Sequence, residues 1–227
     1  MTLSDKAYRA IRRDIIQGDL PADQPLRMAD LSQRYDMGFS PLREALSRLQ
    51  GERLVLAEAL KGFRVAPLSV DEMQDTVETR ILVECDALRL AIRHGDDNWS
   101  AAIVAALYSL KLQAARADEG QLDVWELETR HYNFHRSLLV ACGSSWRMEF
   151  FERLYAATER YRLPIMGAAR RPGQPGRDIQ AEHSALADAA LARDTARAVT
   201  LLADHYRSTA AAIRDRMVKP EGLAQSR

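Results

Sequence analysis

Histidine is the residue type in this chain whose placement suggests chemistry. Four of the five histidines lie in the second half of the sequence: His131, His135, His183 and His205. His131 and His135 are four residues apart, so on a helix they share one face. His183 and His205 fall on two predicted helices that a short turn makes antiparallel neighbours. Imidazole nitrogens are common metal ligands, and three or four converging in a helical bundle suit Zn²⁺, Ni²⁺ or a similar divalent ion with an open position.

Two other interpretations of these histidines remain open. Each histidine can be an ordinary buried residue with a hydrogen bond, because spacing alone does not establish convergence. A metal-dependent hydrolase is the enzymatic alternative, although Tyr132 stands where the metalloprotease motif His-Glu-x-x-His has its glutamate base. The sequence has neither a glycine-rich phosphate loop nor a Gly-x-Ser-x-Gly motif. A hydrolase also leaves the first 66 residues unexplained, so we expect a protein that is not an enzyme.

The elements that must position the histidines are helices. From Ser69 to about Lys219 the sequence predicts six helices and no strands. Ile81, Cys85, Leu88 and Ile92 follow the spacing of a helix face that packs into a core. We therefore predict an all-helical bundle. The predicted helices are Val70–His94, Asn98–Asp118, Asp123–Ala141, Ser145–Leu163, Arg177–Arg193 and Asp194–Val218.

The first part of the chain differs, with short elements interrupted by glycine and proline. Its predicted order is helix, helix, turn, helix and hairpin, which describes a winged helix-turn-helix whose third helix enters the DNA major groove. Ser40 is the expected N-cap of the third helix and Pro41 its first residue. The predicted elements are helices over Ser4–Gln17, around Met28–Tyr35 and over Leu42–Gln50, then strands at Leu54–Leu56 and Phe63–Val65 around a turn at Lys61-Gly62.

Positive charges are placed where such a domain meets DNA. Arg43 and Arg48 lie on the third helix, and Lys61 and Arg64 flank the hairpin turn. The alternative is an ordinary solvated surface on a small α+β domain. The fold prediction is thus mainly α: a winged helix-turn-helix domain over residues 1–68, an all-helical bundle over 69–219, and a tail over 220–227.

Several segments of the N-terminal part carry a family resemblance: Ile16–Pro21, Leu26-Arg27, Gly62–Val65 and above all Ser40–Leu49, with its run PLREALSRL. This part resembles the DNA-binding domain of GntR-family bacterial transcription regulators. Phe39 stands where many members have an arginine that reads guanine, and we expect it to be a buried turn residue, or else to touch a thymine methyl. The resemblance implies DNA contacts from Arg27, Ser40, Pro41, Arg43, Arg48, Lys61 and Gly62.

The helical part has its own resemblance, carried by Arg80–Glu84, Phe134-His135, Ala141–Ser144, Glu182-His183 and His205. It resembles the FCD ligand-binding domain of the FadR-type branch. The metal-binding members have an aspartate where this chain has His131, which makes the ligand set more neutral. The resemblance implies a metal held by the four histidines and a small carboxylate effector held by Arg80, Glu84 and Arg162.

Expectations differ for the two arginines. Arg80 is the preferred effector ligand, and its alternative role is a surface ion pair with Glu84 worth ~0.3–0.5 kcal/mol. Arg162 is the weaker candidate, expected to be exposed. Stretches such as Leu26–Met28 and Arg160–Arg162 also resemble a carbon-starvation-induced repressor of this branch that responds to glutarate. The implied function is a homodimeric regulator, a repressor, whose binding to a double-stranded operator is controlled by an organic acid such as a dicarboxylate.

Composition excludes other classes of protein. The 227 residues contain 32 basic and 32 acidic side chains, so bulk charge does not indicate a polyanion partner. The hydrophobic content of 47% excludes a disordered chain. Two cysteines, Cys85 and Cys142, are too few for a disulfide scaffold. The longest apolar run, Ala101–Leu107, is far shorter than the ~20 residues of a membrane span. We expect a soluble, cytoplasmic protein without membrane partners.

Overall fold

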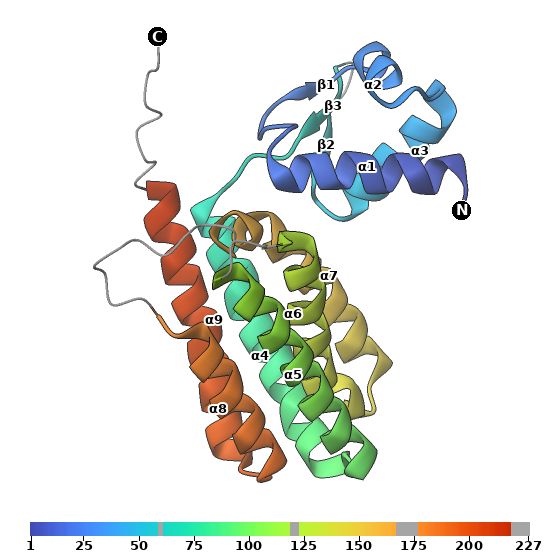
Figure 1. Cartoon of the computed structure of the whole chain (residues 1–227). Helices are drawn as coiled ribbons and strands as arrows, with labels where there is room; N and C mark the ends of the chain where they lie inside the picture. Colours follow the sequence, from blue (N-terminus) through green and yellow to red (C-terminus); the bar gives the residue numbers. More distant parts are fainter. Residues whose placement is uncertain (59–60, 119–122, 167–176, 219–227) are drawn as a thin grey trace.

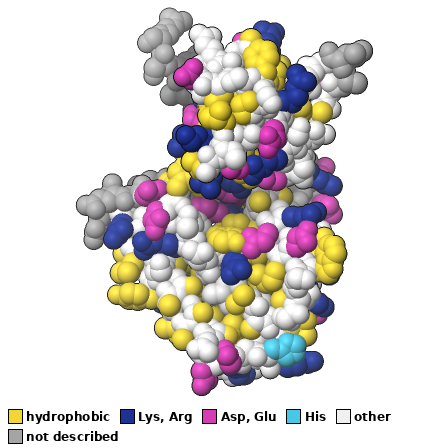
Figure 2. All heavy atoms as spheres, turned by 90° about the vertical axis from the view of Figure 1, so that its right-hand side faces the viewer, with side chains coloured by type: hydrophobic (Ala, Val, Ile, Leu, Met, Phe, Trp, Pro, Cys, Tyr) yellow, Lys and Arg dark blue, Asp and Glu magenta, His cyan; other side chains and the backbone are white. Residues whose placement is uncertain are grey.

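The computed structural model describes residues 1–58, 61–118, 123–166 and 177–218. The predicted tail over 220–227 lies outside the described residues, as does the proline and glycine loop at 171–176. The chain forms an N-terminal domain that sits on one end of an elongated helical bundle (Figure 1). Where the two parts meet, Lys, Arg, Asp and Glu side chains gather on the face seen in Figure 2. None of the described helices is both long enough and apolar enough to span a lipid bilayer.

The N-terminal domain has the predicted order with one additional strand. Its sheet is antiparallel with strand order β1-β3-β2, and Leu26 of β1 lies opposite Phe63 of β3. The sequence predicts no strand at β1, because a two-residue strand is too short to show alternation. The elements are α1 (Leu3–Gln17), β1 (Pro25–Leu26), α2 (Met28–Tyr35), α3 (Phe39–Gly51), β2 (Val55–Glu58) and β3 (Gly62–Val65).

The start of α3 corrects two predictions. Gly38, not Ser40, is the N-cap, and no side chain caps the helix, so Ser40 and Pro41 are already helical. Pro41 is tolerated there because the first-turn N–H groups of a helix have no partner within the helix. Phe39 was expected to be buried and is 52% exposed. It lies in the first turn of α3, while the buried face of that helix consists of Leu42, Ala45, Leu46 and Leu49.

Local sequence explains the ends of α1. Thr2 and Asp5 form a reciprocal capping box, and Gly18 ends the helix with a φ of 89°, a conformation that favours glycine. The buried face of α1, including Ala7, Ile11 and Ile15, packs with α3 and the sheet into the core of this domain.

The helical bundle contains the six predicted α-helices, and its described residues contain no strand. A 3-10 turn, Val140–Cys142, follows α6 where the prediction extended the helix. Large buried side chains such as Leu88, Ile103, Phe134 and Phe151 fill a core separate from that of the N-terminal domain. The helices are α4 (Val70–His94), α5 (Asp97–Asp118), α6 (Val124–Leu139), α7 (Ser145–Met166), α8 (Ile179–Leu191) and α9 (Thr195–Val218).

Candidate metal centre

The four predicted histidines converge inside the bundle. His131 and His135 project from α6, His183 from α8 and His205 from α9, and all four are at most 6% exposed. One ligand nitrogen from each ring lies within 4.8 Å of the others. Two nitrogens on one Zn²⁺ are at most about 4.2 Å apart, twice the Zn–N bond length, so the rings must move slightly closer together before all four can bind one ion. Among the described residues, this is the one group of three or more His, Cys, Asp or Glu with metal-binding proximity.

Burial keeps these imidazoles neutral. Desolvation lowers the pKa of His131, His135 and His183 well below the usual 6.5, and also lowers that of His205. A neutral imidazole has one lone pair free to bind a metal, whereas the protonated ring has none. The cluster therefore presents up to four neutral nitrogen donors at pH 7.

Hydrogen bonds determine which nitrogen of His135 carries the proton. Tyr206 donates its hydroxyl proton to Glu84 at 2.5 Å, so the same oxygen must accept from His135 Nδ1, 3.2 Å away. His135 is therefore protonated on Nδ1, and its Nε2 carries the lone pair. That Nε2 lies 3.1 Å from His131 Nε2, on the inner side of the cluster. Partners of this kind orient the metal-binding histidines of known metalloproteins.

The other rings are oriented in a similar way, with one exception. His205 Nδ1 lies 2.9 Å from Glu182 Oε2, and His131 Nδ1 lies 2.8 Å from the hydroxyl of Tyr155. His183 differs, because neither ring nitrogen has a hydrogen-bond partner among the described residues. A buried polar group without a partner costs about 1–3 kcal/mol, so a ligand at this point removes an existing penalty.

The predicted effector residues lie beside the histidines and are buried. Arg80 Nε donates to Glu84 at 2.7 Å in a pair with side chains 5% and 0% exposed, so this is not the surface pair considered from sequence. Arg162 is also buried, against expectation, and pairs with Glu128 of α6. Thr158 Oγ1 accepts from Nη1 of both arginines, each at 3.1 Å. Arg162 faces inward because the bundle supplies a carboxylate partner, which a single helix sequence does not show.

Four residues of this site were not predicted from the sequence. Glu128 and Thr158 bind the arginines, Tyr206 orients His135, and Tyr155 lies against both guanidiniums, 5.2 Å from Arg80 and 4.3 Å from Arg162. Two sequence signals were available. Glu128 precedes His131 by three residues and so shares its helix face, and Tyr155 and Thr158 are similarly spaced on α7.

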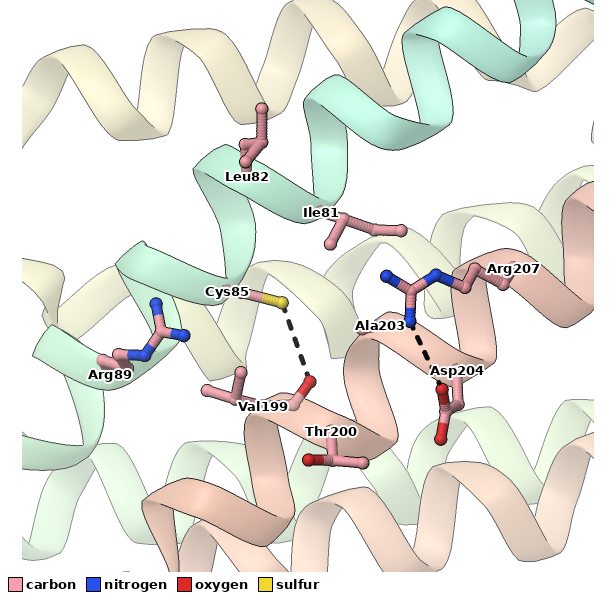
Figure 3. Close-up of a pocket in the computed structure, with 9 residues that line it drawn as sticks. All are labelled: Ile81, Leu82, Cys85, Arg89, Val199, Thr200, Ala203, Asp204 and Arg207. Atoms are coloured by element: carbon pink, nitrogen blue, oxygen red, sulfur yellow. Dashed lines mark hydrogen bonds and ion pairs between the residues drawn. The ribbon is translucent and has the colours of Figure 1, made fainter.

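A separate groove lies between α4 and α9. It has a volume of about 320 Å³ and opens to solvent. Its apolar floor includes Ile81, Cys85 and Val199, and Arg207 pairs with Asp204 at its edge (Figure 3). Cys85 Sγ lies 3.7 Å from the carbonyl oxygen of Val199, and burial raises its pKa to about 11, so the thiol is protonated and unreactive. The groove contains none of the histidines or candidate effector ligands.

The predicted DNA-binding residues differ in their exposure and in their interaction partners. Arg27, Ser40 and Arg43 are exposed, Pro41 is half-buried, and Arg43 makes none of the ion pairs found in the described part of the chain. Arg48 instead lies 4.0 Å from the ring of Tyr8 and bonds to Asp5 at 3.0 Å, so its guanidinium is engaged with α1.

The hairpin has the features of an exposed wing. Lys61 has an 80% exposed side chain and lies 4.0 Å from Glu58. Gly62 adopts a φ of 88°, which favours glycine. Arg64 is held by Glu58 at 2.8 Å, so it is less available than Lys61.

Comparison with known proteins covers both domains. Residues 3–65 match bacterial regulatory proteins of the gntR family, and residues 75–208 match the FCD domain. The chain is 41% identical over 199 residues to the HTH-type transcriptional repressor GlaR of Escherichia coli, covering 87% of this chain and 90% of that protein. It is 38% identical over 217 residues to the uncharacterized HTH-type transcriptional regulator BphR of Paraburkholderia xenovorans, covering 94% and 86%.

A solved structure supports the fold. Escherichia coli McbR/YncC superposes with a TM-score of 0.74 at 18% identity, covering 96% of this chain and 99% of that one. The relatives named above are regulators, and the metalloenzyme alternative finds no support among them. With two family matches that together span most of its length, this chain belongs to the GntR family of transcriptional regulators, in the branch with a C-terminal FCD domain.

Proposed function

We propose that this regulator is a repressor whose operator binding is controlled by a metal-assisted dicarboxylate in the FCD domain. One observation carries the proposal: four buried, neutral imidazoles each bring one nitrogen within 4.8 Å of the others, and one of them, His183, has no hydrogen-bond partner among the described residues. Nitrogen donors of this kind favour Zn²⁺ or Ni²⁺. When bound, such an ion supplies a Lewis-acidic position for a carboxylate oxygen.

The charges around the cluster favour a dianionic effector. Arg80 is balanced by Glu84, and Arg162 by Glu128. The four imidazoles are neutral, and Glu182 beside His205 is balanced by Arg177, so a divalent ion adds two positive charges that no neighbouring side chain in the described part of the chain compensates. A dicarboxylate cancels both, and a planar guanidinium is suited to orient its far carboxylate by paired hydrogen bonds.

DNA recognition is assigned to α3 and the wing. The exposed Arg43 stands in the first half of α3, the part of a recognition helix that contacts bases. We assign contacts with DNA phosphates to Arg27 and Lys61, both of which are exposed. Two copies of the chain then read two half-sites of a pseudo-palindrome.

Fluorescence anisotropy with duplexes from upstream of its own gene tests the repressor assignment. Wild-type protein is expected to bind one duplex, and Arg43→Ala to bind it roughly 5- to 150-fold more weakly, as the loss of one bidentate base contact of about 1–3 kcal/mol implies. Arg153→Ala, which removes an exposed arginine of α7, is the matched control and keeps wild-type affinity. Unchanged binding by Arg43→Ala contradicts the assignment of α3.

The same assay tests the effector. With Zn²⁺ present, succinate, glutarate or adipate is expected to release the duplex, while acetate at equal concentration is not. Release that is equally strong for acetate, or that persists after chelation, contradicts a metal-assisted dicarboxylate site.

We also propose that α5 supplies a contact between two copies. Val104, Tyr108 and Leu112 follow one another at four-residue spacing and are 53%, 64% and 45% exposed. The helix has an exposed acidic residue at its start, Asp97, and an exposed basic one near its end, Arg116. An antiparallel pair of α5 helices centred on Tyr108 covers the apolar stripe and brings these opposite charges together, as a two-fold interface requires.

Light scattering coupled to size-exclusion chromatography checks this contact. We expect wild-type protein to be a dimer and Tyr108→Glu to be a monomer with an unchanged circular dichroism spectrum. Trp146→Glu is the control, because Trp146 is a 67% exposed aromatic residue on α7. A dimeric Tyr108→Glu protein, or a monomeric Trp146→Glu protein, places the interface elsewhere.

A further inference from the structure

One short segment of α7, Thr158–Arg162, contacts both the effector site and the N-terminal domain. We call it the α7 connector. All five of its side chains are buried, at 8% exposure or less. Four of the five, Glu159, Arg160, Arg162 and Tyr161, are ionisable groups, which is unusual for a buried turn of helix. Such side chains are buried only when they have specific partners, so the partners indicate what the segment does.

On its inner side the connector holds the effector arginines. Thr158 Oγ1 accepts hydrogen bonds from Nη1 of Arg80 and of Arg162, each at 3.1 Å. The Thr158 hydroxyl has no further hydrogen to donate, because it already donates to the carbonyl oxygen of Tyr155 at 3.0 Å. Any movement of the two guanidiniums toward a bound carboxylate therefore acts directly on the backbone of α7.

On its outer side the connector reaches the recognition helix through two ion pairs. Glu159 Oε2 binds Arg12 of α1 at 2.5 Å. Arg12 also contacts Glu52, the C-cap residue of α3, at 3.4 Å. Glu52 in turn accepts a 2.6 Å hydrogen bond from the hydroxyl of Tyr8. The pairs link α7 to α1 and to the end of α3 without an intervening loop.

The next two connector residues hold the interdomain link. Arg160 Nη2 donates to the carbonyl oxygen of Ala66 at 2.7 Å, and the hydroxyl of Tyr161 accepts from the backbone N–H of Ser69 at 3.4 Å. Ala66 directly follows β3, and Ser69 is the N-cap of α4. The segment between the domains is thus fixed at both ends by the same turn of α7.

A proline makes this turn of α7 easier to move than a regular helix. Pro164 lies inside α7, four residues after Arg160. Because proline has no N–H, the Arg160 carbonyl lacks its usual helical hydrogen bond, and helices bend most readily at such interruptions. The interruption falls at the connector itself.

We propose that the α7 connector transmits occupancy of the metal and effector site to the recognition helix, with the Glu159–Arg12 ion pair as its main contact. The proposal rests on the function proposed above and adds the route of regulation. Allostery requires a free-energy coupling between two sites, and here named side chains connect them.

Hydrogen–deuterium exchange on the full-length protein, with Zn²⁺ alone as the probe, tests the route. In wild-type protein, Zn²⁺ is expected to slow amide exchange in α6 and to change it in α1 and α3. Glu159→Gln keeps the shape of the side chain and removes its charge, so the change in α6 is expected to remain while that in α1 and α3 is lost. Arg12→Gln is expected to have the same effect, and the double variant no additional one, since the two residues act as one pair.

Glu149→Gln is the matched control, because Glu149 forms an exposed ion pair on the same helix with Arg153. It is expected to behave as wild type. Full retention of the α1 and α3 response in Glu159→Gln overturns the proposal, as does a wild-type response confined to the bundle. If Zn²⁺ changes exchange nowhere in the wild type, the metal centre itself is wrong, and the two failures are thereby distinguished.

Discussion

Saturating Zn²⁺ is expected to raise the melting temperature of chelator-stripped protein by about 5–11 °C. A ligand that binds only the folded state adds about 2.7 kcal/mol at a concentration of 100 Kd. For chains of this length, 1 kcal/mol corresponds to roughly 2–4 °C. The folded state provides the converged nitrogens of His131, His135, His183 and His205, whereas the unfolded chain does not.

His183→Ala separates metal binding from general stability. Both nitrogens of His183 lack partners within the described structure, so its removal deletes no hydrogen bond, and relief of the penalty of about 1–3 kcal/mol for this unpartnered ring offsets the cost of the cavity that alanine leaves. We expect the metal-free melting temperature to change little and the Zn²⁺-induced increase to disappear. His94→Ala is the matched control, because His94 is exposed at the end of α4, outside the cluster.

Elemental analysis of the purified proteins completes the test. Wild type and His94→Ala are expected to retain about one ion per chain, and His183→Ala substantially less. Equal metal content and an equal Zn²⁺ effect in all three proteins contradict a site built on this cluster.

The sequence alone was sufficient for most of the fold. Helix faces such as Ile81, Cys85, Leu88 and Ile92 identify the bundle, since every fourth or third residue is apolar. Strand β1 escaped prediction because its two residues are paired only through the distant Arg64 and Phe63 of β3. The N-cap of α3 was misassigned because Ser40 and Pro41 match the residue types preferred at the N-cap and at the first helical position. The actual N-cap, Gly38, has no side chain that could form a capping hydrogen bond, so the sequence carries no capping signal there.

The histidines of the site were predictable, but most of their surroundings were not. His131 and His135 share a helix face by spacing alone, which places them together in any helical structure. Convergence with His183 and His205 depends on how α8 and α9 pack, which is a property of the whole bundle. The same holds for the burial of Arg162, whose partner Glu128 is 34 residues away on a different helix.

Arg162→Met is expected to destabilise the metal-free protein by about 3–5 kcal/mol. The reason is the partner left behind: Glu128 is 6% exposed in its side chain and would remain buried as an uncompensated charge. The corresponding fall in melting temperature is roughly 6–20 °C. Arg153→Met is the matched control, because its pair with Glu149 has side chains 72% and 47% exposed, and exposed pairs contribute about 0–1 kcal/mol.

A double variant distinguishes lost charge pairing from lost packing. If the unpaired carboxylate causes the loss, Arg162→Met combined with Glu128→Leu should recover most of the stability, since apolar side chains of similar volume replace a buried ion pair at little cost. Urea denaturation followed by circular dichroism measures all four proteins. A double variant as unstable as Arg162→Met shows instead that the arginine stabilises the bundle through Thr158 and the ring of Tyr155, which its guanidinium also contacts.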